Sequence, residues 1–449
     1  MIKDMTKGSP ARLILEFALP MLAGMLFQQL YNLVDTMIVG RFLGVQALAG
    51  VGATGSISFL VMGFCMGLCA GFAIPVAQRF GAGEESRMRE FAANGVWLSI
   101  AFAAVGTVLT VVFCRAILTA MRMPLDCFED AYNYIVVIFA GIPFSIMYNL
   151  LSGYLRSLGD SKTPLFFLIL SSALNVVLDL VMILVFRMGV AGAAIATVAS
   201  QAISGALCLL WIVKKVSVLH ISRSEWRMQP VRMAELCAYG VPMGLQYSVT
   251  AVGAVVLQTA INGLGTIAVA ASTAGNRVLC FLMMPFEALG STMATYGAQN
   301  VGAGRYDRLD RGMLMALFMG FAYSVCALMI AWFFGRDFTS LFVTDPGEEL
   351  LNLAHTYMLA EAAFYPLLTL VNVVRFTIQG MGFSAFAVIA GALEMVARSL
   401  AGIFLVPVLG FLGAARGSPL AWIFADVFLI PAYFRCKKRL MGKAHHAKI

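Results

Sequence analysis

Long apolar runs separated by short polar segments make up most of the chain. A helix needs about 20 apolar residues to cross a bilayer, and each run reaches that length. Several runs exceed the bilayer thickness, so the helices there are expected to tilt, kink or protrude. The runs span residues 13–39, 45–79, 91–118, 131–157, 163–187, 190–216, 231–262, 265–300, 311–335, 351–380, 384–408 and 411–436. The pattern predicts an all-α polytopic membrane protein with twelve transmembrane helices.

Most charged residues lie in the segments between these runs, and the two sides differ in sign. Lysine and arginine concentrate on one side, for example at Arg87, Lys162 and Arg305, whereas the other side carries acidic residues such as Glu129 and Glu348. Loops rich in Lys and Arg stay in the cytoplasm. We therefore expect a multi-pass protein of the cytoplasmic membrane, with both termini in the cytoplasm.

Composition narrows the functional class. The chain is 61% hydrophobic and 12% charged, which is about half the charged share of a soluble domain. Its net charge of +8 sits in loops that would face a membrane surface, so we expect no nucleic-acid partner. The phosphate-binding pattern GxxxxGK[ST] is absent, and no paired catalytic groups are visible. We expect neither an enzyme nor a cofactor; the energy source would be an ion gradient.

Four motifs recur in the same order in both halves of the chain. The pairs are Leu43-Gly44 with Leu264-Gly265, 77–83 with 298–304, Gly159 with Gly382, and Gly189 with Gly410. We infer two six-helix lobes, 1–216 and 233–449, joined by a basic linker, 217–232. Because six is even, both lobes enter the membrane in the same sense, as expected for halves related by a pseudo-twofold axis along the membrane normal. This organisation is typical of secondary transporters.

Several motifs resemble the multidrug and toxic compound extrusion (MATE) family over nearly the whole chain. They are LPMLAGMLFQQLYNLVDTMIVGRFLG, AQRFGAGE, GYLRSLGDSKTPL and AQNVGAGRYD. The resemblance implies two lobes around a central cavity and export of organic cations driven by sodium or protons. One branch of the family keeps cation-binding acids in spans seven and ten. Here there is no acid between Gly240 and Asn262 and no Asp in span ten, so the chain is more similar to the DinF-like branch, whose cation site lies in the N-lobe.

Four polar residues inside the runs form a candidate cation-coupling site. A charge inside the bilayer costs about 2.5 kcal/mol or more, so each one calls for a reason. Asp35 lies in the first run, and Asp179 lies in the fifth, with Asn175 one turn before it on the same helix face. Thr197, in the sixth run, adds a hydroxyl oxygen. Two carboxylates with neutral oxygens suit a proton or a hard cation such as sodium.

The resemblance assigns these four positions to the N-lobe cation site of the DinF-like branch. The alternative is that the two acids only make polar contacts between helices.

Other buried polar groups are candidates for contact with substrate. The resemblance implies that polar residues of the first and fourth runs line the N-lobe cavity, although bonds between helices would explain them equally well. Glu287, in the eighth run, lacks a neighbouring partner and could attract a cationic drug. The residues of the N-lobe set are Gln28, Asn32, Asn149 and Ser152, with Ser172 extending the stripe of Asn175.

Two features of the runs bear on structure. Pro20 interrupts helical hydrogen bonding in the first run, which makes it the expected hinge near Asp35.

Glu394 and Arg398 are four residues apart in the eleventh run and are expected to pair with each other.

Together these features predict a cation-coupled antiporter that exports small amphipathic organic cations by alternating access. We expect a monomer in the bilayer. The alternative is a flippase for a lipid-linked saccharide, or a metabolite exporter of similar architecture, which would need a strongly basic cavity. The acidic groups of the N-lobe favour cationic cargo.

Overall fold

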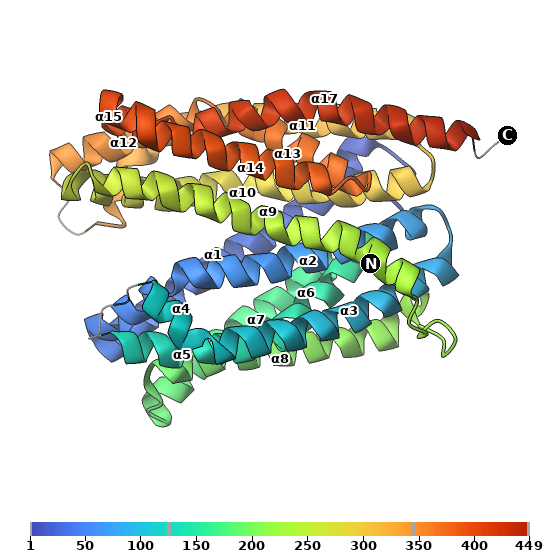
Figure 1. Cartoon of the computed structure of the whole chain (residues 1–449), viewed down its shortest axis with the longest axis horizontal. Coiled ribbons are helices and arrows are strands. Elements are labelled where there is room, and N and C mark those ends of the chain that lie inside the picture. The colour runs from blue at the N-terminus through green and yellow to red at the C-terminus, as the bar shows by residue number, and fades with distance from the viewer. Residues whose placement is uncertain (1, 122, 124–126, 344–346, 447–449) are drawn as a thin grey trace. The chain divides into compact units, whose positions relative to one another are not determined.

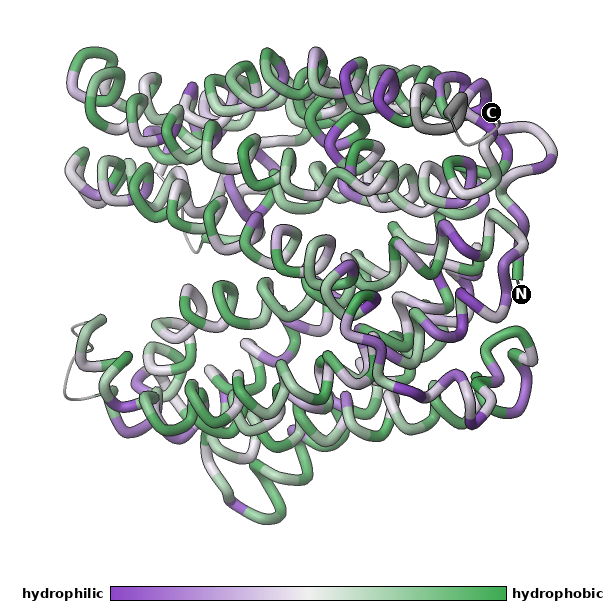
Figure 2. Tube along the Cα trace, turned by 45° about the vertical axis from the view of Figure 1, so that its right-hand side comes forward, coloured by the Kyte–Doolittle hydropathy of each residue, from purple (hydrophilic) through white to green (hydrophobic). Residues whose placement is uncertain are grey.

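The computed structural model describes residues 2–121, 123, 127–343 and 347–446, and within them it contains helices and no strand (Figure 1). Ten helical stretches in this part of the chain are long and apolar enough to cross a membrane, and two bent helix pairs bring the total to as many as 12. The helices are hydrophobic along most of their length (Figure 2). The predicted twelve-helix membrane fold is therefore confirmed. The chain ends, Met1 and residues 447–449, lie outside the described residues, so the cytoplasmic termini stay a prediction.

The helices of the first half pack into one compact unit. Its central contacts join α2 to α6 and α8 to α5, α6 and α7, around buried side chains such as Phe72, Phe139 and Leu155. The elements are α2 (Gly55–Gly81), α3 (Glu85–Val112), α4 (Cys114–Ala120), α5 (Phe128–Ala140), α6 (Ile142–Ser157), α7 (Lys162–Leu180), the π-helix η1 (Val181–Val185), α8 (Gly189–Lys215) and the 3₁₀ helix η2 (Ser217–Leu219).

The second half forms its own compact unit. Here α10 packs on α11, α12 and α13, while α17 packs on α13 and α14, and Phe286, Tyr365 and Trp422 lie in the core. The elements are α10 (Thr266–Gly302), α11 (Tyr306–Ser340), α12 (Glu348–Ala362), α13 (Tyr365–Gly380), α14 (Ala385–Leu400), the π-helix η3 (Ala401–Leu405), α15 (Val406–Leu409), α16 (Phe411–Ala415) and α17 (Gly417–His446).

Two helices, α1 (Pro10–Ala53) and α9 (Pro230–Asn262), run from one unit into the other. Unit 1 comprises Ala23–Gly244 with the residues before Met5, and unit 2 comprises Met5–Leu22 and the chain from Leu245 onward. These limits differ from the predicted 1–216 and 233–449.

The first difference is that Met5–Leu22 belongs to unit 2, although the predicted N-lobe begins at residue 1. Hydrogen bonds explain this difference. The Met5 amide donates to Gln299 Oε1 at 2.8 Å. The Arg308 guanidinium donates to the carbonyl oxygens of Gly8 and Met5 at 2.9 and 3.3 Å. These bonds tie the start of the chain to the second half, which sequence order alone does not reveal.

The repeat found in the sequence reappears in the backbone of each unit. The pair α5 and α6 is bent by 47°, and the pair α12 and α13 by 48°. In both pairs the second helix carries proline in its first turn, where the ring cannot continue the preceding helix. Gly44 and Gly265 both adopt positive φ, at 89° and 101°, a conformation that favours glycine. Each unit also has one π-helical turn, η1 or η3.

Glu225 anchors the linker to α3, and this contact explains why the linker belongs to unit 1. The buried carboxylate accepts hydrogen bonds from the Ser222 amide at 2.7 Å, from Arg89 Nε at 2.9 Å and from Ser86 Oγ at 3.1 Å. Burial alone would raise the pKa of Glu225, but the hydrogen bonds from Ser222, Arg89 and Ser86 outweigh it and hold that pKa below its usual value.

We expect Glu225→Gln to lower the unfolding temperature at neutral pH, because the charged acceptor of three donors is lost, at a cost of about 1–3 kcal/mol. A lowered folded-state pKa stabilises the fold above the ordinary glutamate value of about 4.3, and this stabilisation disappears as pH falls through the folded value. Thermal unfolding of wild type and variant should therefore converge in acid. Glu129→Gln is the control, since Glu129 is exposed and lies 3.5 Å from Arg115. Equal shifts in both variants would contradict the anchoring role.

Candidate cation-binding site

Two carboxyl groups from separate helices meet inside unit 1. Asp179, near the end of α7, is fully buried, and Asp35, in α1, is half-buried. The two side chains lie close enough to interact directly. Two like charges at close range in a low-dielectric interior repel each other, so the pair favours uptake of a proton or a cation.

Neutral oxygens complete the site. Asn175 lies one turn before Asp179 on α7, and its Nδ2 donates to Thr197 Oγ1 of α8 at 3.2 Å. This bond leaves the Asn175 amide oxygen free to face another group. In the described part of the chain, the buried oxygens Asp35 Oδ1, Asn175 Oδ1 and both Oδ atoms of Asp179 accept no hydrogen bond. A proton, a bound ion or a water molecule can satisfy such buried acceptors.

The local backbone explains how these groups are presented. The π-helix η1 begins two residues after Asp179, and single π-turns inside α-helices occur frequently at functional sites. An apolar cluster from α1, η1 and α8, including Ile38, Val39, Ile183 and Ala193, packs nearby. This apolar cluster lowers the local dielectric constant on that side of the acids, which strengthens electrostatic interactions.

Two tyrosines belong to the surroundings of the site, and the sequence analysis missed both. Tyr31 and Tyr134 each interact electrostatically with Asp35 and Asp179. Tyr31 precedes Asp35 by one helical turn, so the i,i+4 rule could have found it. Tyr134 comes from α5, and nothing in its local sequence indicates the contact. The hydroxyl group of a tyrosine at this position can donate a hydrogen bond to a carboxylate.

The oxygen atoms present fit either a sodium ion or a proton. Sodium is a hard cation that prefers carboxylate, amide and hydroxyl oxygens, and Asp35, Asp179, Asn175 and Thr197 supply one or more of each. A proton could instead be shared by the carboxyl pair. Each ion would remove the repulsion between the two acids.

The second half of the chain lacks this constellation. Counted from the matching glycines Gly44 and Gly265, Asp35 corresponds to Val256. Counted from Gly189 and Gly410, Asp179 corresponds to Leu400. The backbone repeats, but the carboxyl pair does not. The acids of unit 1 are thus not required by the fold itself.

The predicted substrate residues of α1 lie beside the acids. Gln28 interacts with Tyr31 through its side chain. Asn32 is exposed and donates to Gln29 Oε1 at 3.4 Å. This exposed polar surface adjoins the candidate cation site, since Asn32 precedes Asp35 by about one turn.

The other predicted substrate residues of unit 1 either form a hydrogen bond within their own helix or are buried. Asn149 Nδ2 donates to the Ser145 carbonyl oxygen at 2.9 Å, and Ser172 Oγ donates to the Leu168 carbonyl oxygen at 2.9 Å. Both bonds stay within one helix. Ser152 is buried.

Glu287 belongs to unit 2, not to the unit that holds the other candidates. Its side chain is exposed on α10, and the same face exposes Asn276 and Arg277. Polar side chains on a membrane-spanning helix face protein or water-filled space rather than lipid.

Pro20 does not break α1. The helix continues through it, and the non-helical residue inside α1 is Gly44. However, the boundary between the units falls between Leu22 and Ala23, one turn or less from Pro20. Pro20 therefore lies close in sequence to the point where α1 passes from unit 2 into unit 1.

A second buried charge cluster occupies unit 2. Arg398 lies 3.5 Å from Glu394 on α14, as the i,i+4 spacing predicted, but Arg375 of α13 also forms an ion pair with Glu394. All three side chains are largely buried. Asp426 and Glu361 interact electrostatically with Arg375 and Arg398 respectively. The two ion pairs explain Glu394 as structural, whereas both Oδ atoms of Asp426 and Oε1 of Glu361 are buried without a hydrogen bond among the described residues.

Comparisons with known proteins agree with this architecture. The MatE family model matches residues 20–181 and 242–404, once in each half. The chain is 30% identical over 392 residues to the probable multidrug resistance protein YpnP of Bacillus subtilis, covering 86% of this chain and 85% of that protein. It is 27% identical over 384 residues to the probable multidrug resistance protein YoeA of the same organism, covering 84% and 82%.

Among solved structures, the fold matches one described as the outward-facing conformation of a multidrug resistance MATE family transporter of the MOP superfamily. The TM-score is 0.91 at 21% identity, covering 97% of this chain and 98% of that one. With twelve candidate spans, a repeated backbone and a family match in each half, the chain belongs to the MatE family of membrane transporters.

Proposed function

We propose that this protein is an antiporter that exports amphipathic organic cations in exchange for sodium ions or protons. The observation that carries the proposal is the group of buried oxygens on Asp35, Asn175 and Asp179 that accept no hydrogen bond in the described residues. Relatives named as multidrug resistance proteins support the class of cargo.

The coupling follows from electrostatics and from chain connectivity. An arriving cation neutralises the carboxyl pair and draws the oxygens of α1, α7 and α8 together. Helix α1 carries Asp35 in unit 1 and begins in unit 2. Ion binding at Asp35 therefore acts on the helix that joins the units near Pro20. Ion binding favours one conformation only to the extent that the ion binds it more tightly than the other.

The rival function is transport of an anionic lipid-linked saccharide or metabolite. Such cargo would need basic groups at the binding site, whereas the buried charges at the candidate site of unit 1 are acidic.

A transport assay separates these functions. Purified protein in liposomes receives either a sodium gradient or a pH gradient, and uptake or efflux of a fluorescent organic cation is recorded. We expect transport under at least one of the two gradients and none when both are collapsed. Cation flux that ignores both gradients, or no cation flux alongside movement of a lipid-linked saccharide, would contradict the proposal.

A further inference from the structure

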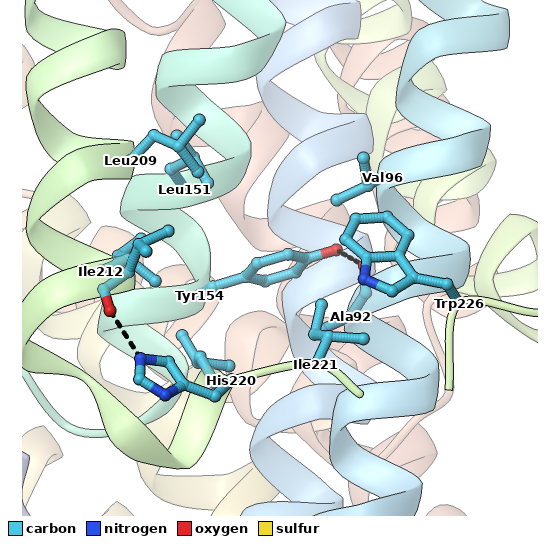
Figure 3. Close-up of a pocket in the computed structure, with 11 residues that line it drawn as sticks. Ala92, Val96, Leu151, Tyr154, Leu209, Ile212, His220, Ile221 and Trp226 are labelled. Atoms are coloured by element: carbon cyan, nitrogen blue, oxygen red, sulfur yellow. Dashed lines mark hydrogen bonds between the residues drawn. The ribbon is translucent and has the colours of Figure 1, made fainter. Parts of the chain in front are cut away.

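A cavity of about 380 Å³ lies in unit 1, and its lining includes none of Asp35, Asn175, Asp179 and Thr197 (Figure 3). This volume falls within the range of about 300–1,000 Å³ that is typical of ligand pockets. Val96 of α3, Leu151 of α6 and Val213 of α8 line it, together with Ile221 and Trp226 of the linker. The Glu225 anchor described above holds that part of the linker in place.

Two polar side chains at the cavity wall already form hydrogen bonds to backbone carbonyl oxygens. The Tyr154 hydroxyl donates to the Ala92 carbonyl oxygen at 2.9 Å, and His220 Nε2 bonds with the Val213 carbonyl oxygen at 2.6 Å. Most of the remaining lining is aliphatic or aromatic. Such a wall suits a hydrocarbon chain better than a polar solute.

The cavity lies next to the lipid-facing surface of a membrane helix. Val213 lines the cavity and is 56% exposed, and its neighbours Leu209 and Trp211 are 43% and 42% exposed. On a spanning helix such apolar exposure is contact with lipid. Trp226, which also lines the cavity, is 39% exposed, and tryptophan is enriched at the membrane–water interface.

Four basic side chains border the same segments. Lys214 and Lys215 directly follow Val213, and Arg223 and Arg227 flank Trp226. All four are exposed, and none makes an ion pair with another described residue. The nearby acid, Glu225, is buried and committed to Arg89. The rim therefore carries unbalanced positive charge at the membrane surface, which attracts anionic lipid headgroups.

We propose that this cavity binds one anionic phospholipid of the leaflet that the linker faces. One acyl chain fills the cavity between α3, α6 and α8, and the headgroup phosphate lies against Lys214, Lys215, Arg223 and Arg227. The site is independent of the proposed transport activity and of the acid pair. Its occupant connects α8 to the linker that leads into α9.

Quenching of Trp226 fluorescence tests the site directly. A variant in which Trp97, Trp211, Trp332 and Trp422 are replaced by Phe leaves Trp226 as the single tryptophan, and its unfolding temperature is compared with wild type first. It is placed in plain phosphatidylcholine bilayers doped with phosphatidylglycerol or phosphatidylcholine brominated on the acyl chains. We expect half-maximal quenching at a mole fraction about tenfold lower for the anionic lipid, because basic residues at the surface favour it.

Paired substitutions locate the chain and the headgroup separately. Val96→Phe fills the cavity and should remove most of the quenching, whereas Val105→Phe, on the lipid-exposed part of α3, should leave it unchanged. Lys214→Gln with Lys215→Gln should reduce the preference for phosphatidylglycerol several-fold but keep quenching by the chain. Arg435→Gln with Lys438→Gln, both exposed on α17, is the matched control.

Three results would overturn the proposal. Equal quenching by both brominated lipids would show that Trp226 senses only bulk lipid. Unchanged quenching in Val96→Phe would place the chain elsewhere. Displacement of the brominated lipid by tetraphenylphosphonium, a hydrophobic cation, would assign the cavity to cargo.

Discussion

Asp35→Asn is expected to abolish gradient-driven export while the protein still folds and reaches the membrane. Asparagine keeps the shape of the side chain but removes its charge, which mimics a permanently protonated site. The ion gradient can then no longer drive export, because an ion no longer binds at position 35. Coupling free energies are typically 1–3 kcal/mol, so we expect the gradient-dependent rate to fall at least about tenfold.

Stability provides an independent readout for this variant. Asp35 Oδ1 and both carboxylate oxygens of Asp179 are buried without a donor among the described residues, so removing one charge relieves repulsion. Asp35→Asn should unfold at the same temperature as wild type or higher when no coupling ion is supplied. Asp179→Asn should behave similarly. Asp337→Asn, at an exposed position of α11, is the control and should transport normally. A loss of transport caused by misfolding would instead lower the unfolding temperature.

Glu394→Gln is expected to destabilise the protein most severely. The carboxylate pairs with both Arg375 and Arg398, and only 4% of its side chain is exposed. Its loss leaves two buried guanidinium groups without their shared counterion, and breaking a buried pair typically costs about 3–5 kcal/mol. Arg398→Gln should cost less, because Glu394 keeps Arg375. Thermal unfolding followed by size-exclusion chromatography measures both.

A double variant distinguishes a structural role from a mechanistic one. Glu394→Gln combined with Arg375→Gln removes one charge of each sign, while Arg398 keeps its interaction with Glu361. Part of the lost stability should return, but not all of it, because Asp426 loses its interaction with Arg375. If instead Glu394→Gln folded normally and failed only in transport, the cluster would belong to the mechanism.

The membrane fold could be predicted from the sequence alone, because each segment that crosses the hydrocarbon core must be long enough to span it and must be mostly apolar. Two spans bend beside Pro143 and Pro366, which lie at the start of the second helix of each bent pair, whereas α1 continues through Pro20, the proline expected to act as the hinge. The π-helical turn after Asp179 was not predicted, because one extra residue in a helical turn leaves no periodic signal. Spacing within one helix found Asn175 beside Asp179, and likewise Arg398 beside Glu394.

Contacts between distant segments were out of reach of such spacing. Arg375 meets Glu394 from another helix, Tyr134 approaches the acid pair from α5, and Met5 bonds to Gln299 across most of the chain. Nothing in one sequence states which helices become neighbours. The carboxyl pair itself was predictable because charges inside a bilayer are rare and costly, and because the family resemblance implies a cation site at these positions.

The central claim is that the coupling ion binds at Asp35 and Asp179, and ion movement tests it most directly. Liposomes containing the protein are given a gradient of organic cation alone, and a trapped indicator records the opposite flux of sodium or protons. Wild type and Asp337→Asn should move one of these ions against the cargo, whereas Asp35→Asn and Asp179→Asn should move neither. Wild-type ion flux in Asp35→Asn at equal protein density would contradict the account and would direct attention to Glu287 or Glu361.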